Sequence, residues 1–245
     1  MEIVGEVVAW LTDPAHWTGS DGIPARFSEH VVLSGVSLAV GLAIALPLGL
    51  AIGHTRRWAG AVVAITNIGR AVPSVGILGI AFVLTLPLVA ALNLRNIGTP
   101  AALIALIALA IPPIVVNAYV GIRDADPDVV EAARGMGMSE RQVLRRVEVP
   151  LGLGVILAGI RTASIQVIAT ATLGAILSTG GLGRYIVDGF AQRDYPQMVS
   201  GALLVMVLVF SSEAIFALVQ RRTVSPGLAI DRTDRLPEPA PGFGL

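Results

Sequence analysis

The sequence predicts an all-helical integral membrane protein with about five transmembrane helices, and three features of the chain support this fold class. It is apolar: 54% of its 245 residues are hydrophobic and only 14% are charged, against about 25% in soluble proteins. Each long uncharged stretch reaches or approaches the ~20 residues that a helix needs to cross a bilayer. None shows the polar face required of a helix in a soluble bundle. The stretches are Val31–Gly53, Ala71–Leu94, Asn96–Ile122, Thr162–Gly183 and Tyr195–Ser212.

Residues 1–29 are predicted to form an interfacial segment before the first span. Trp10 and Trp17 flank a stretch that contains Pro and Gly, and Trp favours the headgroup level of a membrane. A plain loop is the alternative interpretation. The segment carries acidic residues and a single Arg26, whereas a signal peptide begins with basic residues. We therefore expect it to be retained in the mature chain.

The transmembrane domain is expected at 30–222, with its first span at 30–53. The next apolar region, 58–94, would be about 55 Å long as one straight helix, which exceeds the ~30 Å hydrocarbon core. Arg70 and Pro73 interrupt it. One kinked span is the preferred interpretation, and two spans are the alternative.

The remaining spans are predicted at 99–122, 151–178 and 197–220. Pro112 and Pro113 lie near the middle of the third span, where they remove two backbone donors, so a neighbour or a cavity must satisfy the freed carbonyls. In the last two spans, Arg161 is expected to extend to the interface and Glu213 to pair within the bundle or reach water. The tail, 223–245, is rich in Pro, Gly and charge and is expected to be disordered.

Arginine is concentrated in alternate loops, which predicts the orientation of the chain. Arg56 and Arg57, the polar stretch 123–150, and the pair that follows the fifth span lie on one side of a five-span protein. Basic residues favour the cytoplasmic side. The N-terminus is therefore expected outside and the C-terminus inside.

The stretch 123–150 is predicted to form two short helices between spans. Asp126 and Pro127 suit the start of the first helix, and Gly135 and Gly137 suit its end. Ser139 and Gln142 have the spacing of a capping box for the second helix, which Pro150 is expected to end. Such a helix-turn-helix provides a docking surface.

This stretch resembles the EAA loop of permease subunits of ATP-binding cassette (ABC) importers. That motif reads Glu-Ala-Ala, three residues, Gly, nine residues, then Ile-x-Leu-Pro. Here it is matched by Glu131–Ala132–Ala133, by Gly137 and by Val147–Glu148–Val149–Pro150, with Val in place of Ile and Leu. Other stretches are similar to permeases for glycine betaine, carnitine and choline; they are Ala71–Val75, Val155–Ala163, Thr170–Ala175 and Gly180–Gly183.

The resemblance implies a type I importer fold, like that of methionine permeases, in a bacterial plasma membrane. It also implies that the loop docks a separate ATPase, which would hold ATP and Mg. The residues that would form the ATPase-coupling loop are Glu131, Ala132, Ala133, Gly137, Ser139, Glu140, Gln142, Val149 and Pro150. A second permease chain, identical or similar, and an extracytoplasmic substrate-binding protein are the other implied partners.

Composition excludes several other functions. No Lys-Ser/Thr follows the Gly-Gly-Leu-Gly turn, so the chain has no phosphate-binding P-loop and we expect no catalytic residues. The absence of Cys and the wide separation of the three His argue against a metal site, and a net charge of zero gives no reason to expect nucleic acid.

Polar residues inside the spans are the candidates for a translocation path, although helix–helix hydrogen bonding is a more common use of such groups. They are Asn67, Arg70, Asn117, Gln166, Thr170 and Thr172. A quaternary amine is usually held in an aromatic cage, and this chain is only 5% aromatic. We therefore expect the high-affinity site on a separate binding protein.

The sequence favours a permease subunit for a quaternary-amine osmoprotectant. The alternatives are an ABC permease for methionine or another small nutrient, and an ion-coupled secondary carrier. A carrier would typically show inverted repeats and carboxylates within its spans. We find no clear repeat, and only Glu213 lies in a span.

Overall fold

A computed structural model describes residues 2–71, 73–94 and 96–223, without the side chains of residues 2, 61, 63 and 68–71. Every regular element within these residues is helical. In chain order the elements are α1 (Glu2–Thr12), η1 (Pro14–Trp17), α2 (Ile23–Thr55), α3 (Ala59–Ala71), α4 (Ser74–Ala91), α5 (Gly98–Arg123), α6 (Pro127–Gly135), α7 (Glu140–Val143), η2 (Leu144–Glu148), α8 (Val149–Ala171), η3 (Thr172–Leu177), α9 (Gly183–Gln192) and α10 (Tyr195–Thr223).

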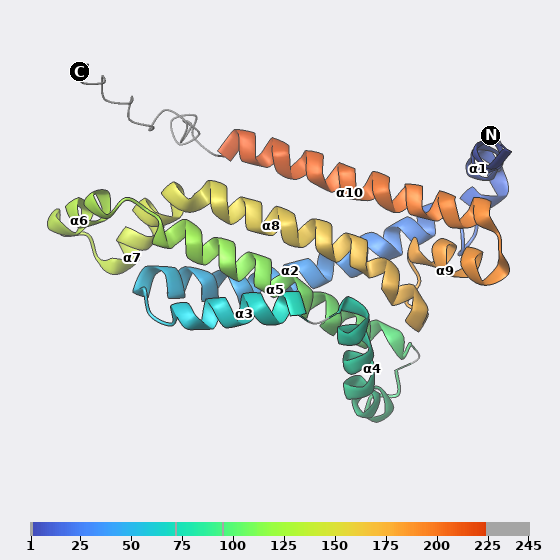
Figure 1. Cartoon of the computed structure of the whole chain (residues 1–245), viewed down its shortest axis with the longest axis horizontal. Coiled ribbons are helices and arrows are strands. Elements are labelled where there is room, and N and C mark those ends of the chain that lie inside the picture. Colours follow the sequence, from blue (N-terminus) through green and yellow to red (C-terminus); the bar gives the residue numbers. More distant parts are fainter. Residues whose placement is uncertain (1, 72, 95, 224–245) are drawn as a thin grey trace, which may run out of the picture.

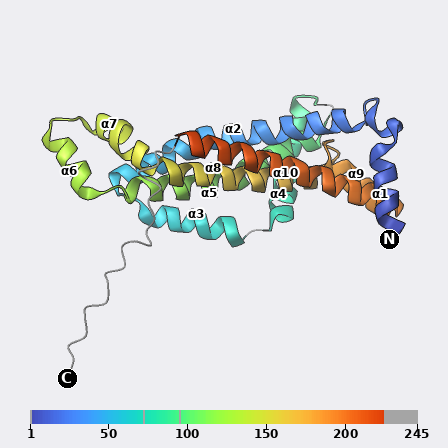
Figure 2. The ribbon, with the colours of Figure 1, turned by 90° about the horizontal axis from the view of Figure 1, so that it is seen from above.

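The long helices form an elongated bundle (Figures 1 and 2). In the part of the chain that the structure describes, five helical segments are long and apolar enough to cross a membrane. The predicted number of spans is thus confirmed. Helices α6 and α7 lie at one end of the bundle, here called the loop end, and α1 and α9 lie at the other, here called the N-terminal end (Figure 1). The predicted tail, 223–245, lies outside the described residues except for Thr223.

Helix α5 lies at the centre of the bundle and packs against α2 on one side and α8 on the other. Small residues recur at every fourth position of α2: Gly41, Ala45, Gly49 and Gly53. A Cβ atom added at Gly49 would lie 2.7 Å from that of Ala118 on α5. The stripe therefore lets the two backbones approach closely, as in other membrane helix pairs.

The region 58–94 contributes one candidate span, as the preferred interpretation requires, but it is divided into two helices rather than kinked within one. Helix α3 follows the bundle, whereas α4 turns away from it (Figures 1 and 2). Pro73 has an extended backbone at the start of α4, and a proline also disfavours helical geometry in the residue before it. Only α4 of the two is long enough to qualify as a span.

The segment before α2 is helical, which excludes the plain-loop interpretation. Trp10 is buried rather than placed as an anchor: its ring stacks on His16 with centroids 4.1 Å apart and meets Tyr185 edge-on. Trp17 is exposed, as an interfacial residue would be. Helix α2 begins at Ile23, so it extends beyond the predicted start of the first span at residue 30.

Arg161 does not extend away from the bundle. Its guanidinium pairs with the carboxylate of Glu213, with Nε and Oε2 2.8 Å apart, and so joins α8 to α10. The pairing predicted for Glu213 is thereby confirmed, whereas the expectation for Arg161 is wrong. A partner within the bundle removes the need for either charge to reach the interface.

Candidate functional site

The loop between α5 and α8 has the local structure that its sequence predicts. The side chain of Asp126 accepts a hydrogen bond from the backbone N–H of Asp128 at 2.9 Å and caps α6. Helix α6 ends at Gly135, and Gly137 adopts the left-handed conformation, with φ of +83°. Gln142 and Ser139 form the expected capping box. Because glycine adopts this conformation without steric cost, Gly137 sets the turn between the two helices.

A small apolar core holds α6 against α7 and the start of α8. Ala133 is buried, whereas Glu131 and Ala132 are exposed. The third residue of the Glu-Ala-Ala motif therefore packs the loop, and the first two remain on its surface. The buried residues of this core are Ala125, Val130, Ala133 and Val143, and Met138, Val147 and Leu151 pack around them.

An ion pair closes the turn from outside. The guanidinium of Arg134 on α6 donates two hydrogen bonds to Glu140 on α7, each 3.0 Å long. These bonds favour the charged guanidinium and raise the pKa of Arg134, against a smaller opposing effect of desolvation. The fork-shaped contact fixes the angle between the two short helices, since a bidentate pair restricts both groups.

Pro150 does not end the second loop helix, contrary to the prediction. Helix α7 continues through a π-helical turn, Leu144–Glu148, directly into α8. Pro150 is the second residue of α8, and the π-helical turn directly before it lies where the proline removes one backbone donor. Both Val149 and Pro150 therefore belong to the fourth span, and the loop and this span form one continuous helical segment.

The π-helical turn places Glu148 inside the protein, only 4% exposed. Its Oε2 lies 2.5 Å from Nδ1 of His54, near the end of α2. Nε2 of the same ring lies 3.2 Å from a carboxylate oxygen of Glu140. Nothing local in the sequence pairs His54 with Glu148, because 94 residues separate them.

A cavity of about 260 Å³ with polar groups in its wall lies between α3, α5 and α8. It brings together Asn117 and Gln166, two of the predicted path residues, and adds Thr66 and Thr162, which the prediction missed. The amide of Asn117 donates a hydrogen bond to the carbonyl of Pro113 at 2.8 Å. The full lining is Thr66, Leu109, Pro112, Pro113, Val116, Asn117, Thr162 and Gln166.

The other predicted path residues do not line this cavity. Asn67 is exposed on α3. Thr170 is absent from the lining, and the hydroxyl of Thr172 donates to the carbonyl of Ala169 in its own helix at 2.7 Å. The side chain of Arg70 lies outside the described residues.

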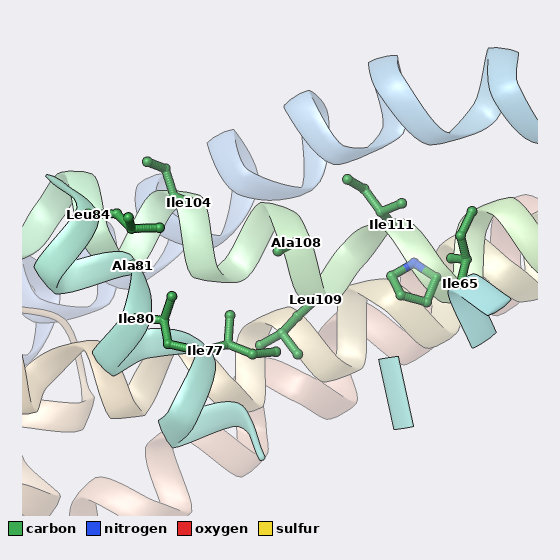
Figure 3. A pocket seen from close by; sticks show the side chains of 10 residues that line it. Ile65, Ile77, Ile80, Ala81, Leu84, Ile104, Ala108, Leu109 and Ile111 are labelled. Carbon is green, nitrogen blue, oxygen red and sulfur yellow. The ribbon is translucent and has the colours of Figure 1, made fainter. Parts of the chain in front are cut away.

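A second cavity, of about 440 Å³, lies beside the first, and apolar side chains form its wall (Figure 3). Its lining residues come from α3, α4 and α5 and are Ile65, Ile77, Ile80, Ala81, Leu84, Ile104, Ala108, Leu109, Ile111 and Pro112. Such a wall offers no group that would compensate a charged solute for its lost water. Of the two cavities, the polar one is the better candidate for a solute path.

The structure thus combines a five-span helical bundle with a compact two-helix loop between its third and fourth spans. The chain belongs to the family of binding-protein-dependent transport system inner membrane components, whose model matches residues 42–225. It is therefore a permease subunit of a bacterial ABC importer, and ATP hydrolysis belongs to a separate chain of the system.

Curated relatives resemble the chain over most of its length. It is 34% identical over 203 residues to the glycine betaine/carnitine/choline transport system permease protein OpuCB of Bacillus subtilis, which covers 83% of this chain and 89% of the relative. It is 32% identical over 210 residues to the carnitine transport permease protein OpuCD of Listeria monocytogenes, which covers 85% and 89%. The osmoprotectant import permease protein OsmW of Salmonella typhimurium is 35% identical over 182 residues, which covers 74% and 81%.

Solved structures confirm the predicted type I fold. A chain of the MetNI methionine ABC transporter in an inward-facing conformation superimposes with a TM-score of 0.71 at 24% identity, covering 87% of this chain and 100% of that one. A chain of an amino acid ABC transporter with histidines gives a TM-score of 0.60 at 17% identity, covering 82% and 93%.

Proposed function

We propose that this permease imports a quaternary-amine osmoprotectant: glycine betaine, carnitine, choline or proline betaine. The observation that carries the proposal is the agreement among relatives that match along most of their length: their names state glycine betaine, carnitine, choline or osmoprotectant transport. Methionine, or another small nutrient, is the alternative substrate. The likeness to the methionine transporter is one of fold, at 24% identity. Family membership argues against an ion-coupled carrier.

The loop end is proposed to face the cytoplasm and to dock the ATPase. The exposed Glu131 and Ala132 provide a contact surface, and Gly137 sets the angle at which α6 is presented. The arginine distribution supports this orientation, with the N-terminus outside and the C-terminus inside. In this arrangement the capping and pairing residues Ser139, Glu140 and Gln142 hold the loop in shape, while Val149 and Pro150 join it to the fourth span.

The polar cavity is proposed as part of the translocation path. Pro113 has no N–H to donate to the carbonyl of Leu109, a residue of the cavity wall. A carbonyl without its helical partner, together with the side-chain oxygens of Asn117 and Gln166, favours a cation. Weak binding of this kind is what a path requires, because the solute must leave again.

Two further partners complete the proposed transporter. The first is a separate binding protein, because aromatic residues form 5% of the chain and an aromatic cage is the usual high-affinity site for a quaternary amine. The second is another permease chain. Two permease proteins of Bacillus subtilis, OpuCB and OpuCD, share the name of one glycine betaine/carnitine/choline system. This supports a heterodimer with a similar chain, and a homodimer is the alternative.

Uptake of labelled glycine betaine into proteoliposomes tests the proposal. The vesicles hold this chain with its candidate ATPase and binding protein, with or without ATP inside. Unlabelled choline, carnitine, proline and methionine are the competitors. ATP-dependent uptake that choline or carnitine blocks is the expected result. ATP-dependent uptake of methionine alone would overturn the substrate, and uptake driven by an ion gradient without ATP would overturn the mechanism.

A further inference from the structure

We propose that His54 is a positioning residue that joins the first span to the ATPase-coupling loop, so that the end of α2 and the loop move as one body. The proposal rests on the proposed function of the loop as the ATPase contact. The EAA motif specifies neither of the two residues concerned. His54 lies outside the motif, and Glu148 occupies its unspecified position between Val147 and Val149.

The contact is built from both sides of one ring. Nδ1 of His54 lies 2.5 Å from Glu148, and Nε2 lies 3.2 Å from Glu140. Each nitrogen of the ring therefore faces a carboxylate. His54 thus contacts the start of α7 and the end of the π-helical turn at once. These are the two ends of the segment through which the loop enters the fourth span.

Burial indicates that this is more than a surface ion pair. The side chain of Glu148 is 6% exposed and that of His54 is 14% exposed, whereas Glu140 remains 61% exposed. A buried carboxylate without a partner is strongly unfavourable, so Glu148 requires His54 nearby. The turn that places Glu148 there is π-helical, a rare geometry often found at functional sites.

The contact continues to the tip of the loop. Glu140, held by His54, also accepts both hydrogen bonds from Arg134 on α6. A continuous chain of polar side-chain contacts therefore runs from α6, beside the exposed Glu131, through Glu140 and His54 to α2. Helix α2 packs along α5, which contributes most of the lining of the polar cavity. A displacement of the loop would reach the cavity by this route.

Two measurements on His54→Leu test the proposal. The first is the ratio of substrate taken up to ATP hydrolysed in the proteoliposomes described above. The second is the distance between spin labels at Arg57→Cys, just after α2, and Arg141→Cys, on α7. Both of these positions are exposed, and the chain has no Cys of its own.

We expect the uptake-to-hydrolysis ratio of His54→Leu to fall about ten-fold, within the usual range of coupling between sites. The distance distribution should broaden, whereas in the unsubstituted protein it stays narrow with and without ATP. His54→Arg, which supplies several N–H donors for the two carboxylates, should restore most of the ratio. Thr55→Ala is the matched control on the neighbouring residue, whose hydroxyl bonds only to its own helix at Ala51.

Glu148→Gln tests the same contact if His54→Leu fails to fold, because it removes the charge and preserves the side-chain size. A narrow distance distribution and an unchanged ratio in either folded variant would overturn the role of His54. A failure of the proposed function is distinguishable: the unsubstituted protein would then lack ATP-dependent uptake, while the spin-label distances would still report whether His54 holds α2 to the loop.

Discussion

Helix α2 contacts later parts of the chain at both ends of the bundle, but the groups that it contacts differ between the two ends. At the N-terminal end the partners are backbone groups: His30 contacts the carbonyl of Ile168 at 3.0 Å, and Glu29 accepts from the N–H of Gly181 at 2.8 Å. At the loop end, His54 contacts the carboxylates of Glu148 and Glu140.

The difference indicates separate tasks for the two ends. A backbone group is held by its helix or turn, so its contacts belong to the packing of the spans, whereas the side-chain contacts at the loop end join α2 to the loop without a backbone hydrogen bond. We therefore expect changes at the N-terminal end to reduce stability and changes at the loop end to reduce coupling. Four predictions follow in order of decreasing effect.

The largest effect is expected from His30→Ala. His30 is 1% exposed, so the change loses a buried hydrogen bond and leaves a cavity. The free energy of unfolding should fall by about 3 kcal/mol. Thermal unfolding in lipid nanodiscs measures it, with Ser28→Ala as the exposed control on the same helix. Little loss of stability together with poor coupling would contradict the division of tasks.

Arg161→Leu should cost about 2 kcal/mol of stability, because it leaves the carboxylate of Glu213 without its partner. This pair lies between the two ends of the bundle. It tests whether a charged contact within the spans contributes to the free energy of unfolding. The double variant Arg161→Leu with Glu213→Leu should recover most of the loss. If Arg161→Leu is as stable as the unsubstituted protein, the pair contributes nothing to stability.

Gly137→Asp is expected to lower ATP-driven uptake about ten-fold while the spans remain folded. A side chain at φ of +83° strains the turn, although there is open space around the position. Gly135→Asp is the matched control, since it introduces the same charge two residues earlier, at a position without positive φ. Equal losses in both variants would assign the effect to charge rather than to the turn.

The local features of the loop could be predicted from sequence because neighbouring residues determine them. Asp126, Pro127 and the Ser139–Gln142 pair act on backbone groups within three residues of themselves. The prediction for Pro150 was wrong, because a proline inside a helix usually ends or kinks it and this one does not end the helical segment. The outcome depended on the π-helical turn before it, which has no comparable sequence signal.

Contacts across the bundle could not be predicted in the same way. The polarity of Asn117 and Gln166 indicated an interior role, but nothing in the sequence distinguished them from Asn67, which is exposed on α3. Which side chains face the cavity depends on how α3 and α8 are oriented about their own axes when they pack on α5. His54 and Glu148 show the same limit, since their pairing follows from helix packing over a separation of 94 residues.

The smallest effect is expected at Tyr185, whose hydroxyl donates to the backbone carbonyl of Asp21 at 2.6 Å. Burial raises the pKa of this phenol to about 12, from 10.0, so the folded state favours the neutral form. Its contribution is complete below pH 10 and is lost as the pH rises from 10 towards 12. At neutral pH, Tyr185→Phe should cost about 1 kcal/mol, and the difference from the unsubstituted protein should shrink in alkaline solution. Thermal unfolding against pH measures this, with the exposed Tyr195→Phe as control. If Tyr185→Phe is as stable as the unsubstituted protein at neutral pH, Tyr185 stabilises this end by packing on Trp10 and not through its hydrogen bond.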